Sequence, residues 1–181
     1  MSTRTVLHEA DIARALTRIS HEILESNRGP DGLVLLGIPT RGVALANRIA
    51  ALIAEIASEE LDGARIPVGA LDVTMYRDDL HRNPTRTPQP TQIPAGGIDG
   101  KVVVLVDDVL FSGRSIRAAL DALQDIGRPS VVRLAALVDR GHRDLPIRPD
   151  FVGKNLPSAR DERVNVRLSD VDGIDEVTIE S

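Results

Sequence analysis

The sequence predicts an α/β fold with a mostly parallel central sheet flanked by helices. Nearly uninterrupted apolar segments of strand length occur at 33–38, 102–106 and 131–138, which is the pattern of strands buried on both faces. Segments with helical periodicity lie between them, and strands that alternate with helices form parallel sheets through helical crossovers. Because the chain has 181 residues, we expect a single domain over residues 1–181.

The first half of the chain supplies two of the expected helices. Apolar residues recur every three or four positions between Ile12 and Ile23, which predicts a helix over 11–26. The same periodicity predicts a second helix over 42–58, soon after the first apolar segment. Partial alternation of apolar and polar residues then predicts a strand over 67–76.

Residues 77–99 interrupt this alternation of strands and helices. They contain four prolines and two glycines and show no periodicity. Long unpatterned insertions in compact domains are usually functional lids or disordered segments. We therefore expect a mobile flap, with an ordinary disordered loop as the alternative. Beyond it, the pattern predicts a helix that begins near Arg114 and ends at Gly127, the strand 131–138, and short strands and turns from Phe151 onward.

The composition excludes several classes of protein. Without cysteine, the chain has neither disulfides nor thiolate metal sites. Its formal charge of −5 argues against general polyanion binding, and its aromatic residues, Tyr76, Phe111 and Phe151, are too few for a base-stacking platform. The apolar runs are too short to cross a bilayer, and the first residues lack the apolar stretch of a secretory signal. We expect a cytoplasmic location and no membrane partner.

Two adjacent carboxylates, Asp107 and Asp108, stand where the apolar segment 102–106 ends. Ligands of such sheets bind beyond the carboxyl ends of the strands, and the free amides at 112–115, where the next helix begins, form an anion site. The carboxylates would repel a bare phosphate, so the ligand must also offer donors. A ribose 5′-phosphate offers both groups. The alternative is that one aspartate is solvated and the other caps the helix.

A second candidate site lies at Pro39-Thr40-Arg41-Gly42, between the first apolar segment and its helix. Backbone amides near Gly42 could approach a diphosphate closely, and Arg41 adds charge and a planar fork of donors. The alternative is an ordinary turn with an arginine that faces solvent. The bond between Ile38 and Pro39 could be cis, because proline makes that isomer accessible.

The order of these features resembles the ribose-phosphate signature of type I phosphoribosyltransferases. In VVVLVDDVLFSGRSI, an apolar strand, paired acids and a small-residue loop follow one another, whereas the G-x-x-x-x-G-K-[ST] and G-x-G-x-x-G motifs are absent from the sequence. The resemblance implies the type I phosphoribosyltransferase fold with a flexible hood loop, which residues 77–99 match. Pro39 and Phe111 depart from the family's pattern, where a polar or basic residue and a tyrosine are common.

Longer segments narrow the resemblance. ALTRISHEILESN, LDVTMYRDDL and LVDRGHRDLPIRPDFVGKNLPSA resemble the bacterial family of pyrimidine operon regulators that are also uracil phosphoribosyltransferases. This implies that uracil and 5-phosphoribosyl 1-diphosphate (PRPP) react to UMP and diphosphate, with Mg²⁺ carried by the diphosphate. It also implies binding to pyrimidine leader mRNA under the control of UMP or UTP, and a homodimer or larger homo-oligomer.

The resemblance also implies roles for particular residues. The catalytic ones would be Asp107, Asp108, Arg41 and Arg77. PRPP and nucleotide would contact Thr40, Arg41, Gly42, Asp107, Asp108, Val109, Leu110, Phe111, Ser112, Gly113, Arg114 and Ser115. Uracil would lie near Val138, Asp139, Arg140 and Gly141. Leader RNA would bind Arg14, Thr17, Arg18, His21, Arg143, Arg148 and Lys154.

Other functions stay open at this point. An RNA-binding regulator could use the nucleotide pocket only to sense UMP, with little catalysis. A structural subunit could bind ribose phosphate without either activity. From charge pattern alone, the proposed RNA-binding residues would be a solvated helix face with surface salt bridges.

Overall fold

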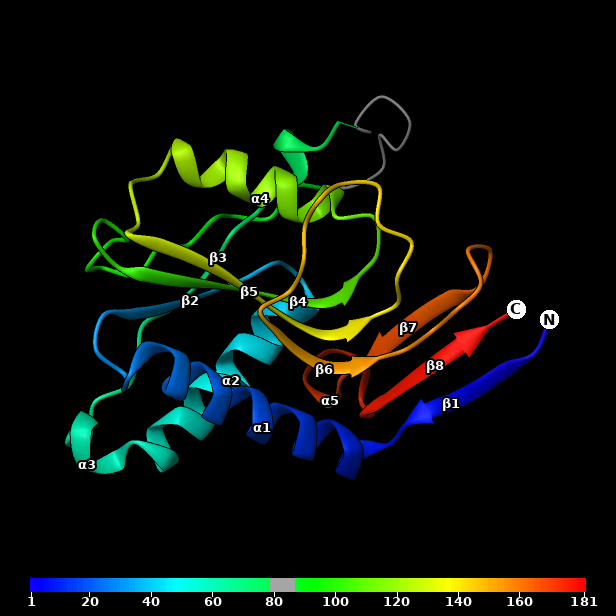
Figure 1. Cartoon of the computed structure of the whole chain (residues 1–181), viewed down its shortest axis with the longest axis horizontal. Helices are drawn as coiled ribbons and strands as arrows, with labels where there is room; N and C mark the ends of the chain where they lie inside the picture. Colours follow the sequence, from blue (N-terminus) through cyan, green and yellow to red (C-terminus); the bar gives the residue numbers. More distant parts are fainter. Residues whose placement is uncertain (79–86) are drawn as a thin grey trace.

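The computed structural model describes residues 1–78 and 87–181 and contains two β-sheets with helices packed against them (Figure 1). The larger sheet has five parallel strands in the order β3-β2-β4-β5-β6. Its strands are β2 (Leu33–Gly37), β3 (Val68–Ala70), β4 (Val102–Leu110), β5 (Val131–Asp139) and β6 (Phe151–Asn155). The predicted α/β class with a parallel sheet is confirmed.

Helices cover both faces of this sheet. Figure 1 shows α1 (Glu9–Asn27) and α2 (Arg41–Ile56) below it and α4 (Arg114–Gln124) above it. Buried residues form one apolar cluster with α1 and α2 and another with α4. The predicted helices are therefore confirmed, although the second ends at Ile56 and is followed by the short α3 (Ser58–Leu61). Among the described residues, no helix is long and apolar enough to span a membrane.

The smaller sheet joins the two ends of the chain. It is antiparallel, in the order β1-β8-β7. Its strands are β1 (Thr3–Leu7), β7 (Arg163–Arg167) and β8 (Glu176–Glu180), with α5 (Ser169–Asp172) between the last two. Figure 1 shows this sheet beside the carboxyl ends of the parallel strands, with the two termini next to each other. The strand β1 was not predicted, because its five residues carry only a short apolar pattern.

The chain changes direction between β2 and β4. From β2 it crosses through α2 to β3 on one side, whereas from β4 it crosses through α4 to β5 on the other. Neighbouring strands whose crossovers diverge in this way leave a crevice at their carboxyl ends, where α/β proteins bind ligands. The crevice lies between the end of β2 and the end of β4.

Two glycines bring α2 close to these strands. A Cβ at Gly37 would lie 2.4 Å from Val43 Cα, and one at Gly42 would lie 2.4 Å from the Val106 carbonyl oxygen. Such distances are shorter than any side chain tolerates, so only glycine permits the observed packing. The close approach places the first residues of α2 directly beside the end of β4.

The structure corrects two predicted boundaries. β4 continues to Leu110, so Asp107 and Asp108 lie within the last part of the strand rather than beyond it. The strand predicted over 67–76 is wrong apart from β3, because the chain turns into the 3₁₀ helix η1 (Thr74–Tyr76). There the Asp72 side chain accepts hydrogen bonds from the Thr74 N–H at 3.2 Å and hydroxyl at 2.7 Å, a local pairing that competes with a strand ladder.

The hood insertion predicted over 77–99 is only partly described, since residues 79–86 lie outside the described residues. Its second half is anchored to the main sheet. Gln92 and Ala70 exchange backbone hydrogen bonds of 2.8 and 2.9 Å, and Ile98 is buried in the apolar cluster beneath α4.

Ion pairs attach the α5 segment to α2. The Arg48 guanidinium contacts Asp175 at 2.8 Å and Asp170 at 3.2 Å, and it also donates to the Ser169 hydroxyl. These carboxylates raise the pKa of Arg48, and the hydrogen bond from Arg48 lowers the pKa of Asp175 to about 2. The smaller sheet is thus joined to the larger one by charged contacts as well as apolar packing.

The packing at Gly37 leads to a first prediction. Gly37→Ala should lower the free energy of unfolding by about 1–3 kcal/mol, because its Cβ would collide with the backbone of α2. Gly96→Ala is the control, since a Cβ there meets no atom within 4 Å, and we expect a change below about 0.5 kcal/mol. Urea denaturation measures both. Equal losses would contradict the packing argument.

The Arg48–Asp175 pair leads to a prediction for pH. Because the pKa of Asp175 falls from 3.8 to about 2 on folding, its stabilising contribution is present above the unfolded value and is lost as pH drops through the folded one. Asp175→Asn should be less stable at neutral pH and lose less on acidification than the wild type. Thermal melts between about pH 5 and pH 2 test this. Asp31→Asn, an exposed position, should behave like the wild type.

Candidate active site

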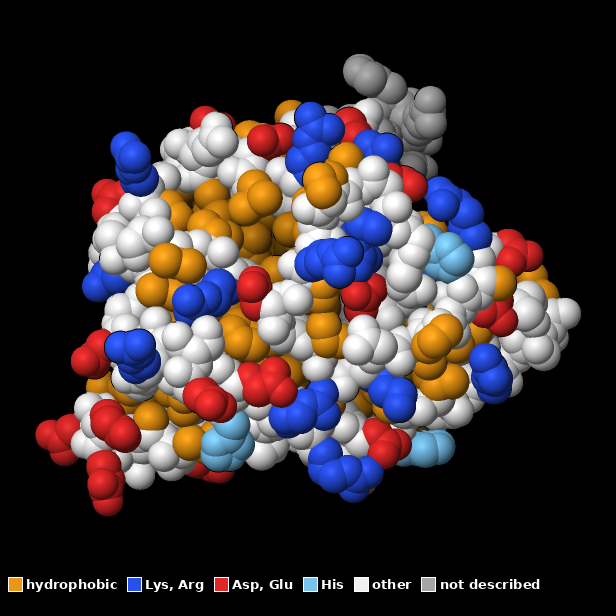
Figure 2. Space-filling view, in the orientation of Figure 1, with side chains coloured by type: hydrophobic (Ala, Val, Ile, Leu, Met, Phe, Trp, Pro, Cys, Tyr) orange, Lys and Arg blue, Asp and Glu red, His pale blue; other side chains and the backbone are white. Residues whose placement is uncertain are grey.

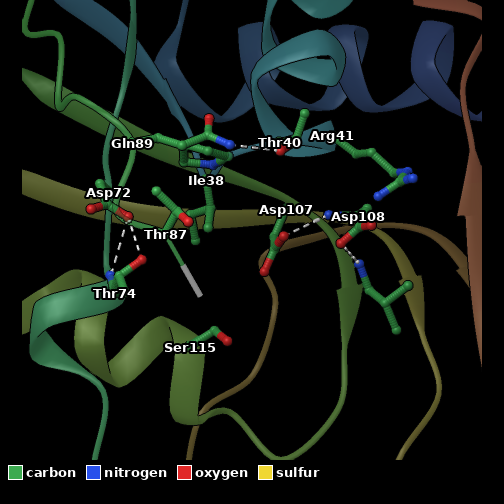
Figure 3. Close-up of a pocket in the computed structure, with 12 residues that line it drawn as sticks. Ile38, Thr40, Arg41, Asp72, Thr74, Thr87, Gln89, Asp107, Asp108 and Ser115 are labelled. Carbon is green, nitrogen blue, oxygen red and sulfur yellow. Dashed lines mark hydrogen bonds between the residues drawn. The ribbon is translucent and has the colours of Figure 1, made fainter. Parts of the chain in front are cut away.

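A polar cleft of about 340 Å³ lies at the crevice between β2 and β4 (Figure 3). Its walls come from the loop after β2, the end of β4, the start of α4 and the chain around η1. The lining residues are Ile38, Pro39, Thr40, Arg41, Asp72, Thr74, Thr87, Gln89, Asp107, Asp108, Val109 and Ser115. The cleft thus combines carboxylates, hydroxyls and a guanidinium, which suits a ligand with both hydroxyl and anionic groups.

The paired carboxylates stand at the carboxyl end of β4. Asp107 is 9 % exposed, and its Oδ1 accepts the Asp108 N–H at 2.9 Å. Asp108 Oδ1 accepts the Val109 N–H at 2.7 Å. Neither caps α4, whose N-cap is Gly113, so the helix-capping alternative is wrong. Figure 3 shows Asp107 directed into the cleft between β4 and the segment that carries Asp72 and Thr74.

The loop before α4 turns sharply at Gly113. Its φ of 91° is in the left-handed region, which favours glycine, and it aims the first turn of α4 back toward β4. The Ser112 hydroxyl accepts the Arg114 N–H at 3.3 Å, and Ser115 lines the cleft. An eleven-residue helix whose N-terminus lies beside two serines is suited to hold a phosphate.

Arg77 and Asp78 lie against the start of α4. Arg77 Nη1 donates to the Ser115 hydroxyl at 2.6 Å, and Arg114 pairs with Asp78 at 2.6 Å. The beginning of the hood insertion is therefore held at the predicted phosphate loop. Arg77 was predicted as a catalytic group, and the structure brings it to that loop rather than to the Arg41 side of the cleft.

The loop after β2 contains a cis peptide bond. It joins Pro39 to Thr40, one residue after the bond between Ile38 and Pro39 that the sequence singled out. The Gln89 side chain donates to the Thr40 hydroxyl at 3.1 Å. This hydrogen bond connects the second half of the hood insertion to the loop after β2. Arg41 is the first residue of α2.

Arg41 makes a bidentate contact with Asp172 of α5. Its Nε and Nη2 donate to the two carboxylate oxygens at 3.0 and 2.7 Å. The hydrogen-bonded Asp172 raises the pKa of Arg41, with a smaller contribution from Asp108, and Arg41 in turn lowers the pKa of Asp172. Figure 3 shows the guanidinium on the Asp108 side of the cleft. Asp172 was absent from the sequence-based site.

Several cleft residues were missed by sequence reasoning. Asp72 and Thr74 line the cleft from the segment before the irregular insertion, and Thr87 and Gln89 line it from within the insertion. A signal for Asp72 exists, because it follows β3 and therefore lies at a carboxyl end of the parallel sheet. The strand predicted over 67–76 concealed that position.

The segment predicted to face uracil lies beside the loop after β4. Val138 is fully buried in β5, and the Arg140 N–H donates to the Leu110 carbonyl at 3.1 Å. The Arg140 guanidinium lies over the Phe111 ring, with its Cζ 4.3 Å from the ring centroid, and its Nε donates to the Ser158 hydroxyl. Burial of this side chain lowers the pKa of Arg140. Of the four residues predicted to lie near uracil, only Gly141 is exposed, and its N–H donates to the Asp139 carboxylate at 3.0 Å.

The predicted RNA-binding residues of α1 share one exposed face. Arg14, Thr17, Arg18 and His21 are all exposed, and they border a shallow depression on the helix. Arg18 donates to the Val152 and Gly153 carbonyls at 2.7 and 2.6 Å, so this face adjoins β6, where Lys154 is exposed. Figure 2 shows basic side chains over α1 interspersed with acidic ones.

Arg143 differs from the others in this group. Its guanidinium donates to the carbonyls of Phe111 and Ile147 and pairs with Asp139 at 2.8 Å. Only 20 % of its side chain is exposed, so it braces the loop after β5 against the loop after β4. Arg148, by contrast, is exposed.

Among residues 1–78 and 87–181, no group of three acidic or histidine side chains could hold a metal ion. The cleft nevertheless carries the carboxylates of Asp72, Asp107 and Asp108. One or two of these carboxylates fit Mg²⁺, which proteins commonly hold through one or two carboxylates together with substrate phosphates and water.

Comparisons with known proteins identify the family. The phosphoribosyl transferase domain model matches residues 2–169. A hypoxanthine phosphoribosyltransferase from Trypanosoma cruzi shares the fold, with a TM-score of 0.74, 14% identity, and coverage of 98% of this chain and 94% of that chain. A second, from Staphylococcus aureus, has a TM-score of 0.63 and 21% identity, covering 89% and 80% of the two chains. The type I phosphoribosyltransferase fold is confirmed.

Among curated proteins, the bifunctional protein PyrR of Leifsonia xyli is 73% identical over 99% of this chain and 98% of its own. The bifunctional protein PyrR of Streptomyces coelicolor is 61% identical over 97% and 89% of the two chains. The first of these alignments covers 99% of this chain, so it includes both sheets and the segments that line the cleft. The chain therefore belongs to the phosphoribosyltransferase family and, within it, to the bifunctional PyrR proteins.

Proposed function

We propose that this phosphoribosyltransferase acts on uracil and PRPP, giving UMP and diphosphate, and that it also regulates pyrimidine genes by binding their leader mRNA. The supporting observation is the cleft that places Asp107 and Asp108 beside Arg41 and next to the first turn of α4. This arrangement matches the hydroxyls, diphosphate and 5′-phosphate of PRPP group by group.

In this reaction N1 of uracil loses its proton and bonds to C1′ of the ribose, while the bond from C1′ to the diphosphate breaks. Positive charge develops on the ribose ring as the diphosphate departs. The carboxylates of Asp107 and Asp108 would accept hydrogen bonds from the sugar hydroxyls and favour that charge electrostatically. The amides between Ser112 and Ser115 would anchor the 5′-phosphate.

The departing diphosphate would be held at the start of α2. Thr40 and Gly42 offer backbone amides, and Arg41 offers a guanidinium at the edge of the cleft. Mg²⁺, bound with the substrate near the cleft carboxylates, would neutralise charge on the diphosphate. Arg77, hydrogen-bonded to Ser115, would act on the 5′-phosphate side.

The regulatory role is supported by the exposed face of α1 and the adjacent Lys154. Proteins contact RNA largely through loops and bulges, with phosphate contacts that depend on salt. Because the chain carries a net charge of −5, its basic groups must be concentrated on one surface to bind RNA, and a homodimer or larger assembly would increase that concentration. The alternative, a regulator that only senses UMP in the cleft, makes the same RNA contacts without turnover.

The enzymatic proposal is tested with an Asp107→Asn, Asp108→Asn double variant. It should keep its fold but lose at least about 100-fold in kcat/KM, because the neutral amides no longer favour the developing positive charge. Diphosphate release from uracil and PRPP is the measurement. Asp121→Asn, on the exposed side of α4, should match the wild type. Turnover by the wild type with a purine base but not with uracil would refute the uracil assignment.

The RNA proposal is tested with an Arg14→Ala, Lys154→Ala double variant saturated with UMP. Its affinity for pyrimidine leader RNA should fall, and the dependence of log K on log salt should become shallower by about 1 for each lost phosphate contact. Arg65→Ala, Arg117→Ala removes two exposed arginines elsewhere and should bind as the wild type does. Equal losses in both variants would point to nonspecific charge attraction.

A further inference from the structure

Asp172 connects the smaller sheet to the catalytic cleft. We infer that Asp172 is a positioning residue for phosphoribosyl transfer, which orients Arg41 toward the diphosphate without touching the substrate itself. The inference rests on the proposed function, because it takes the diphosphate as the group that Arg41 meets.

The contact uses one edge of the Arg41 guanidinium. Nε and Nη2 donate to Asp172, which leaves Nη1 and the second hydrogen of Nη2 to form the other donor edge. No described residue accepts a hydrogen bond from Nη1. Arg41 also lines the cleft, with 34 % of its side chain exposed. The edge that remains has the spacing to receive two oxygens of a phosphate group.

Asp172 itself has little freedom to move. Its Oδ2 accepts the Leu168 N–H at 2.9 Å, and its own N–H donates to the Leu168 carbonyl at 2.6 Å. Leu168 is fully buried in the core beneath α2, and the Asp172 side chain is 17 % exposed. The carboxylate is therefore fixed by the core, and Arg41 adapts to it.

The segment around Asp172 is also fixed on its far side. Asp170 and Asp175 bind Arg48, which lies two helical turns along α2 from Arg41. Asp170, Asp175 and Arg48 are not among the residues that line the cleft. The α5 segment is thus attached to α2 independently of Arg41, and Asp172 can be altered without releasing the segment.

Asp172 could in principle compete with the diphosphate for Arg41, but the geometry favours positioning. A competitor would occupy the donor edge that faces the ligand, whereas Asp172 takes the Nε edge and leaves three N–H donors. Asp108 supplies a second negative charge near Arg41. The contact with Asp172 thus holds the guanidinium at the edge of the cleft, where Arg41 is also a lining residue.

The test compares Asp172→Asn with Asp175→Asn. Each variant removes one carboxylate that forms an ion pair with an arginine of α2. Only Asp172→Asn affects an arginine that lines the cleft. For Asp172→Asn we expect the KM for PRPP, and the Kd for Mg²⁺-diphosphate by calorimetry, to rise about tenfold, with the KM for uracil within about twofold. Asp175→Asn should lose thermal stability, but its KM for PRPP and its Kd for Mg²⁺-diphosphate should match those of the wild type. A lower KM for PRPP in Asp172→Asn would show competition and overturn the inference.

A double-mutant cycle with Arg41→Ala separates positioning from general destabilisation. If Asp172 acts only through Arg41, Asp172→Asn should add no further loss of diphosphate affinity in the Arg41→Ala background. An equal loss in both backgrounds would overturn the inference. The proposed function is tested separately by wild-type turnover with uracil, and the diphosphate affinities can be compared even if that turnover is absent.

Discussion

The parallel pairing of β2 with β4 determines the position of the cleft and of the residues that line it. Two glycines allow α2 to pack closely against both strands. Gly37 faces the backbone of α2, and Gly42 faces the carbonyl of Val106. Because of this contact the loop at Pro39–Thr40 and the carboxylates at 107 and 108 face each other across one crevice. A side chain at either glycine would separate the two halves of the cleft.

The distribution of charge follows from this arrangement. The carboxylates of β4 lie on one wall, the guanidinium of Arg41 stands beside them, and the start of α4 provides a third polar wall. A ligand must offer hydroxyls to the first and negative charge to the other two. PRPP meets these requirements because its ribose separates a 5′-phosphate from a diphosphate. The smaller sheet contributes through Asp172, so the ends of the chain take part in building the cleft.

Much of the fold could be predicted from the sequence because its strands are buried on both faces and its helices are strongly amphipathic. The Asp107–Asp108 pair was found because a charged pair that ends an apolar strand is unusual. Asp172 could not be found, since its role depends on a contact between residues 131 positions apart. Asp72 was hidden because its own side chain turns the backbone out of the strand that the local pattern indicated.

The resemblance to a known family predicted more about function than the residue patterns did. Charge and periodicity indicated a sugar-phosphate cleft and a basic helix face, whereas uracil and leader RNA entered through similarity to a family. The structure adds a physical distinction within the proposed RNA surface. Arg14 and Lys154 are exposed, and Arg14 pairs with Asp11 of its own helix, whereas Arg143 is engaged in bracing two loops.

A crystal structure of the protein with UMP tests the central claim most directly. The account predicts the phosphate within about 3 Å of the backbone amides between Ser112 and Ser115, and the ribose hydroxyls at similar distances from Asp107 and Asp108. UMP bound elsewhere, or bound in this cleft with its phosphate at Arg41 and its ribose away from the carboxylates, would contradict it.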